Sequence, residues 1–193
     1  MDNSENKKTT IDLSDIYLDT PRLLLRPWWE NDLQDFYAYA SVPGVGEMAG
    51  WPHHTAIEDT KRVLSMFMEE KNVWAIVLKE ENRVIGSLGL HSSWANEEKH
   101  YPRDRILEIG YVLSKEYWGK GLMPEAVKRV LRFCFDQLSL DAVTVCHFTE
   151  NTQSRRVIEK CGFTFFQTDR YYVDFCDEDW EEMQYILWRE DMK

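Results

Sequence analysis

The sequence has little glycine, proline or cysteine, and it has no long apolar run. Its 193 residues include 9 Gly, 6 Pro and 4 Cys. Cys134, Cys146, Cys161 and Cys176 have neither CxxC spacing nor a histidine cluster beside them, so we expect reduced thiols and no metal site. No apolar stretch approaches the roughly 20 residues that span a bilayer, and residues 1–19 lack the basic and then apolar pattern of a secretory signal. We therefore expect a cytoplasmic protein without a membrane partner.

Basic side chains are also in deficit. The chain has 23 Lys and Arg against 34 Asp and Glu, a net charge of −11. A negative field repels phosphate backbones, which disfavours a nucleic-acid partner. Net charge describes the far field, however, so a local basic pocket for a small anionic cofactor is compatible with it. An acidic surface also attracts cationic amines.

What the chain does have is enough apolar sequence for a folded core, with 44% hydrophobic and 13% aromatic residues. Residues 1–19 are polar and are expected to form a flexible N-terminal tail. No linker or internal repeat divides the remainder, so residues 20–193 are expected to form a single domain. The oligomeric state is left open between a monomer and a homodimer.

Hydrophobic periodicity predicts a mixture of strands and helices. Strands are expected at residues 22–26, 74–78, 84–90, 106–113 and 142–148, with two more within 163–189 on either side of an acidic loop at 174–182. Helices are expected near residues 33–40, 57–68, 124–138 and 151–161, the last ending at Gly162 in a left-handed conformation. Because strand, Gly-rich turn, helix and strand make a right-handed crossover, the strands that begin at Ile106 and Ala142 should run parallel.

The most informative segment lies between that first strand and its helix. It reads Tyr117-Trp118-Gly119-Lys120-Gly121-Leu122-Met123-Pro124-Glu125-Ala126. Two glycines let backbone N–H groups converge ahead of a helix N-terminus, where they can hold a pyrophosphate, and Lys120 would add a positive charge. A tight turn without a ligand is the open alternative. A dinucleotide fingerprint fails because Pro124 stands where its third glycine belongs, and a Walker loop needs Ser or Thr after Gly-Lys.

A second segment follows the next strand of the crossover. Asn151 can cap the helix there, and Ser154 lies one turn further on the same side, facing the strand ends where ligands of open sheets bind. A capping Asn with an incidental Ser is the alternative.

In this order the segments resemble the GNAT superfamily of acyl-CoA-dependent N-acyltransferases. The matching motifs are Thr20-x-Arg22-Leu-x-Leu-Arg26, Gly86-x-x-Gly89, Glu108-Ile-Gly-Tyr111-Val112-Leu113, Trp118-Gly-Lys-Gly121-x-x-x-Glu125-Ala126, Asn151-x-x-Ser154, Glu159-Lys-x-Gly162-Phe163 and Tyr185-x-Leu187-x-Arg189. The resemblance runs from about Thr20 to Arg189 and is greatest to the branch of the ribosomal-protein N-terminal alanine and serine acetyltransferases. The chain departs from the superfamily signature at Trp118 and Met123, where Gln or Arg and Gly or Ala are usual.

The resemblance implies a fold and a co-substrate. The fold is α/β (α+β): a mixed, mostly antiparallel sheet of six to seven strands with a central, splayed parallel pair and helices on both faces. The co-substrate is acetyl-CoA, with its pantetheine arm on the backbone of the splayed strand and on Asn151, its pyrophosphate on the turn, and its sulfur near Ser154. The implied binding residues are Tyr111, Val112, Leu113, Trp118, Gly119, Lys120, Gly121, Leu122, Met123, Asn151 and Ser154.

The implied reaction is direct attack of a primary amine on the thioester in a ternary complex. The acceptor is a protein N-terminus or a small-molecule amine. Glu108 is the first candidate for general base, directly or through water, and a structural Glu is the alternative. Ser154 is the candidate acid for the thiolate, because Val157 and Ile158 stand where other branches have a Tyr; a cofactor contact without proton transfer is the alternative. The rival functions are a non-catalytic acyl-CoA-binding or sensing module and a regulatory domain for another nucleotide.

Several residues are candidates for the acceptor side. His53 and His54 lie in a Gly- and Pro-rich loop and are expected to line a surface without binding metal. Trp28, Trp29 and Trp51 either wall the acceptor pocket or pack beneath the loop, and packing is expected for at least one of them. The acidic segment 174–182 either attracts a cationic acceptor or is a solvated face.

Overall fold

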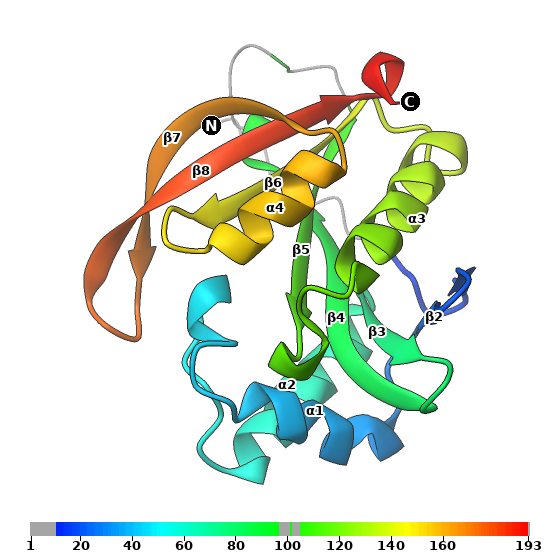
Figure 1. Ribbon diagram of the computed structural model, residues 1–193, viewed down its shortest axis with the longest axis vertical. Helices are drawn as coiled ribbons and strands as arrows, with labels where there is room; N and C mark the ends of the chain where they lie inside the picture. The colour runs from blue at the N-terminus through cyan, green and yellow to red at the C-terminus, as the bar shows by residue number, and fades with distance from the viewer. Residues whose placement is uncertain (1–10, 97–100, 102–104, 193) are drawn as a thin grey trace, which may run out of the picture.

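The computed structural model (Figure 1) describes residues 11–96, 101 and 105–192. Within them, eight strands form one sheet in the order β1-β2-β3-β4-β5-β6-β8-β7. The strands are β1 (Leu18–Asp19), β2 (Leu23–Arg26), β3 (Val73–Leu78), β4 (Arg83–Ser92), β5 (Ile106–Leu113), β6 (Ala142–Phe148), β7 (Thr164–Val173) and β8 (Glu178–Trp188). Every neighbouring pair is antiparallel except β5 and β6, which are parallel. The predicted mixed sheet with a central parallel pair is confirmed.

Four α-helices cover the two faces of this part of the chain. They are α1 (Leu33–Ala40), α2 (Ile57–Glu70), α3 (Leu122–Asp136) and α4 (Thr152–Lys160). Short 3₁₀ turns are η1 (Glu30–Asp32), η2 (Glu47–Ala49), η3 (Trp94–Asn96), η4 (Lys115–Tyr117) and η5 (Arg189–Asp191). No helix in the described ranges is long and apolar enough to cross a membrane.

The alternation of side chains along β3 separates two hydrophobic cores. Trp74 and Ile76 point to the core beneath α3 and α4, whereas Val73 and Ala75 point to the core beneath α1 and α2. Since successive strand residues face opposite sides, a strand buried on both faces reads as the unbroken apolar run that β3 shows. The predicted placement of helices on both faces is therefore confirmed.

The helices α3 and α4 lie within two residues of their predicted bounds, 124–138 and 151–161. Pro124 lies in the first turn of α3, whose apolar stripe from Leu122 to Phe135 is buried. At the start of α4, the Asn151 Oδ1 atom accepts a hydrogen bond of 3.0 Å from the Ser154 N–H, and Gly162 ends the helix at a φ of +88°. Figure 1 shows α3 and α4 side by side across the parallel strands.

Three details differ from the prediction. The sheet has an eighth strand, the two-residue β1, in the segment expected to be tail. Leu13 and Leu18 are buried in the core, so the packed part of the described chain includes residues 11–19, and residues 1–10 lie outside the description. The expected acidic loop is shorter, because Glu178–Glu182 already belong to β8, where they pair with β7 and Glu182 also pairs with β6. Cross-strand pairing, which local composition does not reveal, causes the first and the third of these differences.

An ion pair is buried where β2 leaves the sheet. The Arg26 guanidinium donates two hydrogen bonds of 2.7 Å to the Asp32 carboxylate, and both side chains are 7% exposed. Asp32 Oδ2 also accepts a hydrogen bond of 2.8 Å from the Trp29 N–H, and the Trp29 ring lies 3.6 Å from the guanidinium.

Removal of one member of this pair should destabilise the fold strongly. We expect Asp32→Asn to lower the free energy of unfolding by about 3–5 kcal/mol, because it leaves a guanidinium buried without its counter-charge. The matched control is Asp59→Asn, whose partner Arg62 is 78% exposed, and which should cost about 1 kcal/mol or less. Urea unfolding curves measure both, and equal costs would contradict the expectation.

Candidate active site

The sheet opens between its two parallel strands. β5 and β6 pair at Ile106–Ala142, Leu107–Val143 and Glu108–Thr144. Both strands continue, to Leu113 and Phe148, with no further pair in their register although both lie in the described residues. Backbone groups of β5 beyond Glu108 therefore lack a strand on that side, which is the splay that the resemblance implies.

The register on the other side of β5 determines which backbone groups face this gap. The Ser114 N–H donates to the Ile85 carbonyl at 2.8 Å, and Val112 is the cross-strand partner of Ser87. Because backbone groups alternate in direction along a strand, those of Val112 point to β4 and those of Tyr111 and Leu113 point into the gap. Val112 thus contributes its side chain rather than its backbone.

A cavity of about 260 Å³ fills the gap and extends to the Gly-rich turn. Most of the predicted cofactor residues line it: Tyr111, Val112, Leu113, Trp118, Gly119, Gly121, Leu122, Met123, Asn151 and Ser154. Lys120 does not line it; the Lys120 ammonium lies 4.9 Å from the centre of the Tyr117 ring. Trp118 does more than line the wall, since its indole N–H donates to the Leu113 carbonyl at 2.7 Å.

The turn before α3 presents bare backbone to this cavity. Gly119 and Gly121 have φ angles of +77° and +74°, a conformation that favours glycine. A Cβ at Gly119 would meet no atom within 4 Å, and no side chain caps α3. The first-turn N–H groups of Leu122 and Met123, at the positive end of the helix dipole, are suited to an anionic ligand.

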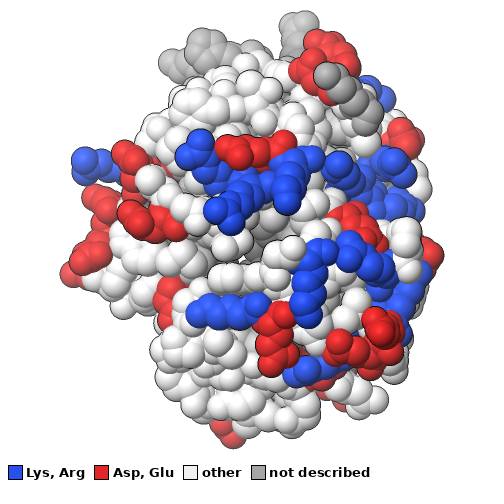
Figure 2. All heavy atoms as spheres, viewed as in Figure 1, with Lys and Arg blue, Asp and Glu red and all other residues white. Residues whose placement is uncertain are grey.

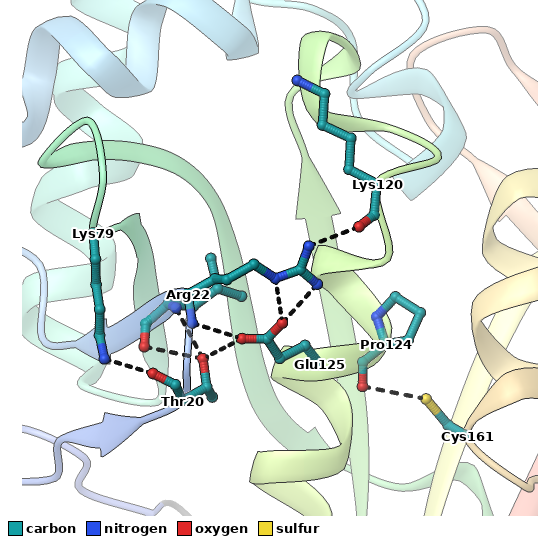
Figure 3. Close-up of polar contacts among 8 residues, drawn as sticks. Thr20, Arg22, Lys79, Lys120, Pro124, Glu125 and Cys161 are labelled. Carbon is teal, nitrogen blue, oxygen red and sulfur yellow. Dashed lines mark hydrogen bonds and ion pairs between the residues drawn. The ribbon is translucent and has the colours of Figure 1, made fainter.

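A cluster of polar contacts, here called the Arg22 clamp (Arg22, Glu125 and Thr20), fixes this turn to β2 (Figure 3). The Arg22 side chain donates to the Lys120 carbonyl at 3.0 Å and to the Glu125 carboxylate at 2.7 Å, and the Thr20 hydroxyl donates to Glu125 at 2.7 Å. Burial opposes ionisation of Glu125, but these hydrogen bonds and the Arg22 charge outweigh it and hold the pKa of the carboxyl below its usual range. The clamp explains why Arg22 and Glu125 belong to the motifs quoted above.

Basic side chains surround the cavity although the molecule is acidic overall. Figure 2 shows Lys and Arg gathered on both sides of a central hollow. Arg156 and Lys160 of α4 also line the cavity, although neither was among the predicted site residues. Their signal was the spacing of Gln153, Arg156 and Lys160, which puts all three on one helix face.

The start of α4 connects the two sides of the gap. The Tyr111 hydroxyl lies 2.8 Å from Ser154 Oγ and 3.3 Å from the Ser154 carbonyl, so the side chain crosses from β5 to the helix. Asn151 donates from Nδ2 to the Met48 carbonyl of η2 at 3.0 Å. Burial raises the pKa of Tyr111, which keeps the phenol protonated and able to donate.

Glu108 lines an adjoining polar cavity of about 210 Å³ rather than the cofactor cavity. Its Oε2 atom accepts from the Thr144 hydroxyl at 3.3 Å and from the Cys146 thiol at 3.5 Å. Burial, and then the charge of Glu182 on β8, raise the pKa of Glu108 to about 7. Glu182 lines the same cavity. It belongs to the acidic segment 174–182 of the sequence analysis, but its position beside Glu108 depends on the register between β6 and β8, which the sequence alone does not predict.

Some of the residues predicted for the acceptor side pack against other side chains, and others line a cavity. Trp28 is buried against Phe36, with ring centroids 4.8 Å apart, and Trp29 is 49% exposed beside Arg26. Trp51, His53 and His54 line a third cavity, of about 550 Å³, under α1 and α2.

Comparisons with known proteins agree with this geometry. Residues 22–164 match the family model described as Acetyltransferase (GNAT) domain. The chain is 29% identical over 151 residues to the uncharacterized N-acetyltransferase YoaA of Bacillus subtilis (strain 168), covering 76% of this chain and 81% of that protein. Among solved structures, a GNAT-family acetyltransferase from Bacillus anthracis superimposes with a TM-score of 0.79 at 24% identity, covering 91% of this chain and 99% of that one. The ribosomal-protein-S5-alanine acetyltransferase of Vibrio fischeri gives 0.67 at 19%, covering 93% and 100%. At these identities, the two structures show a shared fold.

Loss of the Arg22 clamp should weaken binding at the turn. We expect Arg22→Met to raise the Kd for acetyl-CoA, the ligand that the resemblance implies, by about tenfold, since it removes charge-assisted hydrogen bonds that fix the turn backbone. Isothermal titration measures this. Arg129→Met is the matched control: Arg129 contacts the Asp19 carbonyl of β1 and not the turn. A Kd unchanged in Arg22→Met would show that the turn holds its shape without the clamp.

Proposed function

The chain belongs to the GNAT acetyltransferase family, and we propose that it transfers the acetyl group of acetyl-CoA to a primary amine by direct attack within a ternary complex. The family makes acetyl-CoA the acyl donor and the chain an acyltransferase. The proposal adds the order of bond making, the residues that move protons and the kind of acceptor.

One observation carries the proposal: three cavities meet at the open edge of β5. Ala49 and Tyr111 line all of them. One cavity ends at the helix N-terminus suited to phosphates, the second holds Glu108, and the third is the apolar space under α1 and α2. A thioester reached from the first can therefore meet an amine held in the other two, and the proximity of two oriented reactants supplies a large part of the acceleration.

The balance of the reaction defines what the protein must provide. Bound acetyl-CoA supplies an activated acyl group, whose carbon–sulfur bond breaks as the amine nitrogen bonds to the carbonyl carbon. An ammonium acceptor loses two protons, of which one is released and the other ends on the CoA thiol. The protein must therefore offer a base for the amine, a donor for the developing oxyanion and a proton source near the sulfur.

Glu108 suits the role of base. A carboxyl with a pKa of about 7 is partly ionised at neutral pH and takes a proton more readily than an ordinary Glu. Thr144 and Cys146 hold its Oε2 atom by hydrogen bonds, and its cavity adjoins Ser154 and Tyr111. The backbone N–H of Tyr111, directed into the gap, suits the role of oxyanion donor.

Ser154 suits the role of proton source. Its hydroxyl is in contact with the Tyr111 hydroxyl at 2.8 Å, and a hydrogen bond from the phenol would stabilise the oxygen as it gives its proton to sulfur. The second proton lost by the amine then returns to Ser154 through solvent, so that the net products are the amide, the CoA thiol and one released proton. The Ser154 N–H is occupied by Asn151, which fixes the first turn of the helix.

The general test is turnover of acetyl-CoA with amines. Purified protein is incubated with acetyl-CoA and a panel of small amines and N-terminal peptides, free CoA is followed over time, and the product is identified by mass. Acetyl-CoA binding without release of CoA for any amine would favour a binding or sensing module instead.

The pH dependence should identify Glu108. We expect kcat/KM to fall as the pH drops through about 7, because a group with a raised pKa loses its basic form there, and Glu108→Gln should lower turnover by about 10²-fold and remove this limb. Glu182→Gln removes a like charge and should move the limb to lower pH. Glu181→Gln is the control, since that carboxylate is exposed and bonded to Thr149. If kcat/KM of Glu108→Gln still falls as the pH drops through about 7, Glu108 is excluded as the base.

Removal of the Ser154 hydroxyl should affect chemistry more than binding. We expect Ser154→Ala to lower kcat by about 10²-fold with little change in the Kd for acetyl-CoA, the pattern of a lost acid. Thr152→Ala, on the exposed side of the same helix, is the control. If Ser154→Ala turns over like the wild type, Ser154 is only a contact residue.

A further inference from the structure

The floor of the third cavity is a gap in the side-chain layer of the sheet. Gly89 of β4 and Gly110 of β5 are direct cross-strand partners and both line the cavity. The His91 ring lies over them: a Cβ at Gly89 would be 2.6 Å from His91 Nε2, and a Cβ at Gly110 would be 3.4 Å from the ring. Two paired glycines on one face remove the side chains that would otherwise fill the space under α2.

The walls of this space, here called the Gly89–Gly110 hollow, are mainly apolar and aromatic. Phe36 and Phe67 stack with centroids 5.6 Å apart, and Trp51 lies 5.1 Å from the His54 ring. Burial lowers the pKa of His54, so that ring is uncharged at neutral pH. The volume of about 550 Å³ is in the range of small-molecule sites.

Several hydrogen-bonding groups around the hollow are already paired with the protein. His54 Nδ1 lies 2.7 Å from the Thr60 hydroxyl, and His53 Nδ1 lies 2.6 Å from a Glu47 carboxylate oxygen. The Asp59 carboxylate accepts from the Ala56 N–H and pairs with Arg62 at the rim. Peptide amides or a second ammonium placed against the apolar wall would lose water without gaining partners there, which is unfavourable.

The inner end of the hollow is different, because it reaches the reaction centre. Gly110 and Tyr111 line both the hollow and the cavity of Glu108 and Glu182. A ligand with an apolar body in the hollow can thus direct one ammonium toward two carboxylates, beside the open edge of β5.

We propose that the acceptor is a primary amine with a single ammonium group and an apolar, ring-sized body that occupies the Gly89–Gly110 hollow. This inference rests on the proposed function and narrows it from primary amines in general to one class. A protein N-terminus or a polyamine does not match the hollow.

The test compares three acceptors and measures binding separately from turnover. The probes are 2-phenylethylamine, spermidine and an alanyl tripeptide, each assayed with the full chain by titration calorimetry and by CoA release with acetyl-CoA. We expect kcat/KM for 2-phenylethylamine to be at least about tenfold higher than for the other two, as one well-filled apolar pocket allows.

Two variants on one helix locate the binding site. Met66 and Met68 of α2 are 42% and 37% exposed, but only Met66 lines the hollow. We expect Met66→Glu to raise KM for 2-phenylethylamine about tenfold without changing the Kd for acetyl-CoA, because it puts a carboxylate beside the apolar body. Met68→Glu should change neither.

The outcomes separate this inference from the proposed function. Binding of 2-phenylethylamine that is weakened by Met66→Glu, without CoA release from any amine, would support the hollow as a site and contradict the transferase function. Turnover that is highest with spermidine or with the peptide would support the function and overturn the inference. Equal effects of Met66→Glu and Met68→Glu would also overturn it.

Discussion

The parallel pairing of β5 with β6 stops after Glu108 and Thr144, and the other site groups take their positions from that point. Up to it, the two strands satisfy each other's backbone. Beyond it, the edge of β5 from Tyr111 to Leu113 has no neighbouring strand. Trp118 bonds the Leu113 carbonyl, and an extended ligand with amide groups can complete the remaining groups. The helix N-terminus and the first turn of α4 flank this edge because the crossover connection must return over it.

Basic side chains line the cofactor cavity, and acidic side chains line the cavity beside it. Arg156 and Lys160 give the cofactor side a local positive potential within a protein of net charge −11, whereas Glu108 and Glu182 make the neighbouring cavity acidic. The open edge lies between these regions, so an anionic carrier and a cationic amine are attracted to opposite sides of one point.

Local sequence patterns were sufficient for most helices and strands and for the turn, because these depend on short-range chemistry, whereas the architecture of the sheet was implied by the family resemblance. Gly119, Gly121 and Gly162 have positive φ angles, and Asn151 caps α4, as residue type and spacing predict. Apart from Arg156 and Lys160 of α4, the features that were missed depend on register between distant segments. Glu182 reaches Glu108 only through the β6–β8 pairing, the hollow exists because Gly89 pairs with Gly110, and β1 is visible only once β2 stands beside it. Val112, an implied binding residue, directs its backbone groups to β4, and strand alternation directs those of Tyr111 and Leu113 into the gap.

Asn151 makes one contact to each of two segments that are far apart in the chain. Its Oδ1 atom accepts a hydrogen bond from the Ser154 N–H of α4, and its Nδ2 group donates one to the Met48 carbonyl of η2. Met48 lines both the cofactor cavity and the cavity of Glu108. One amide side chain therefore joins the cap of α4 to a wall that the two cavities share.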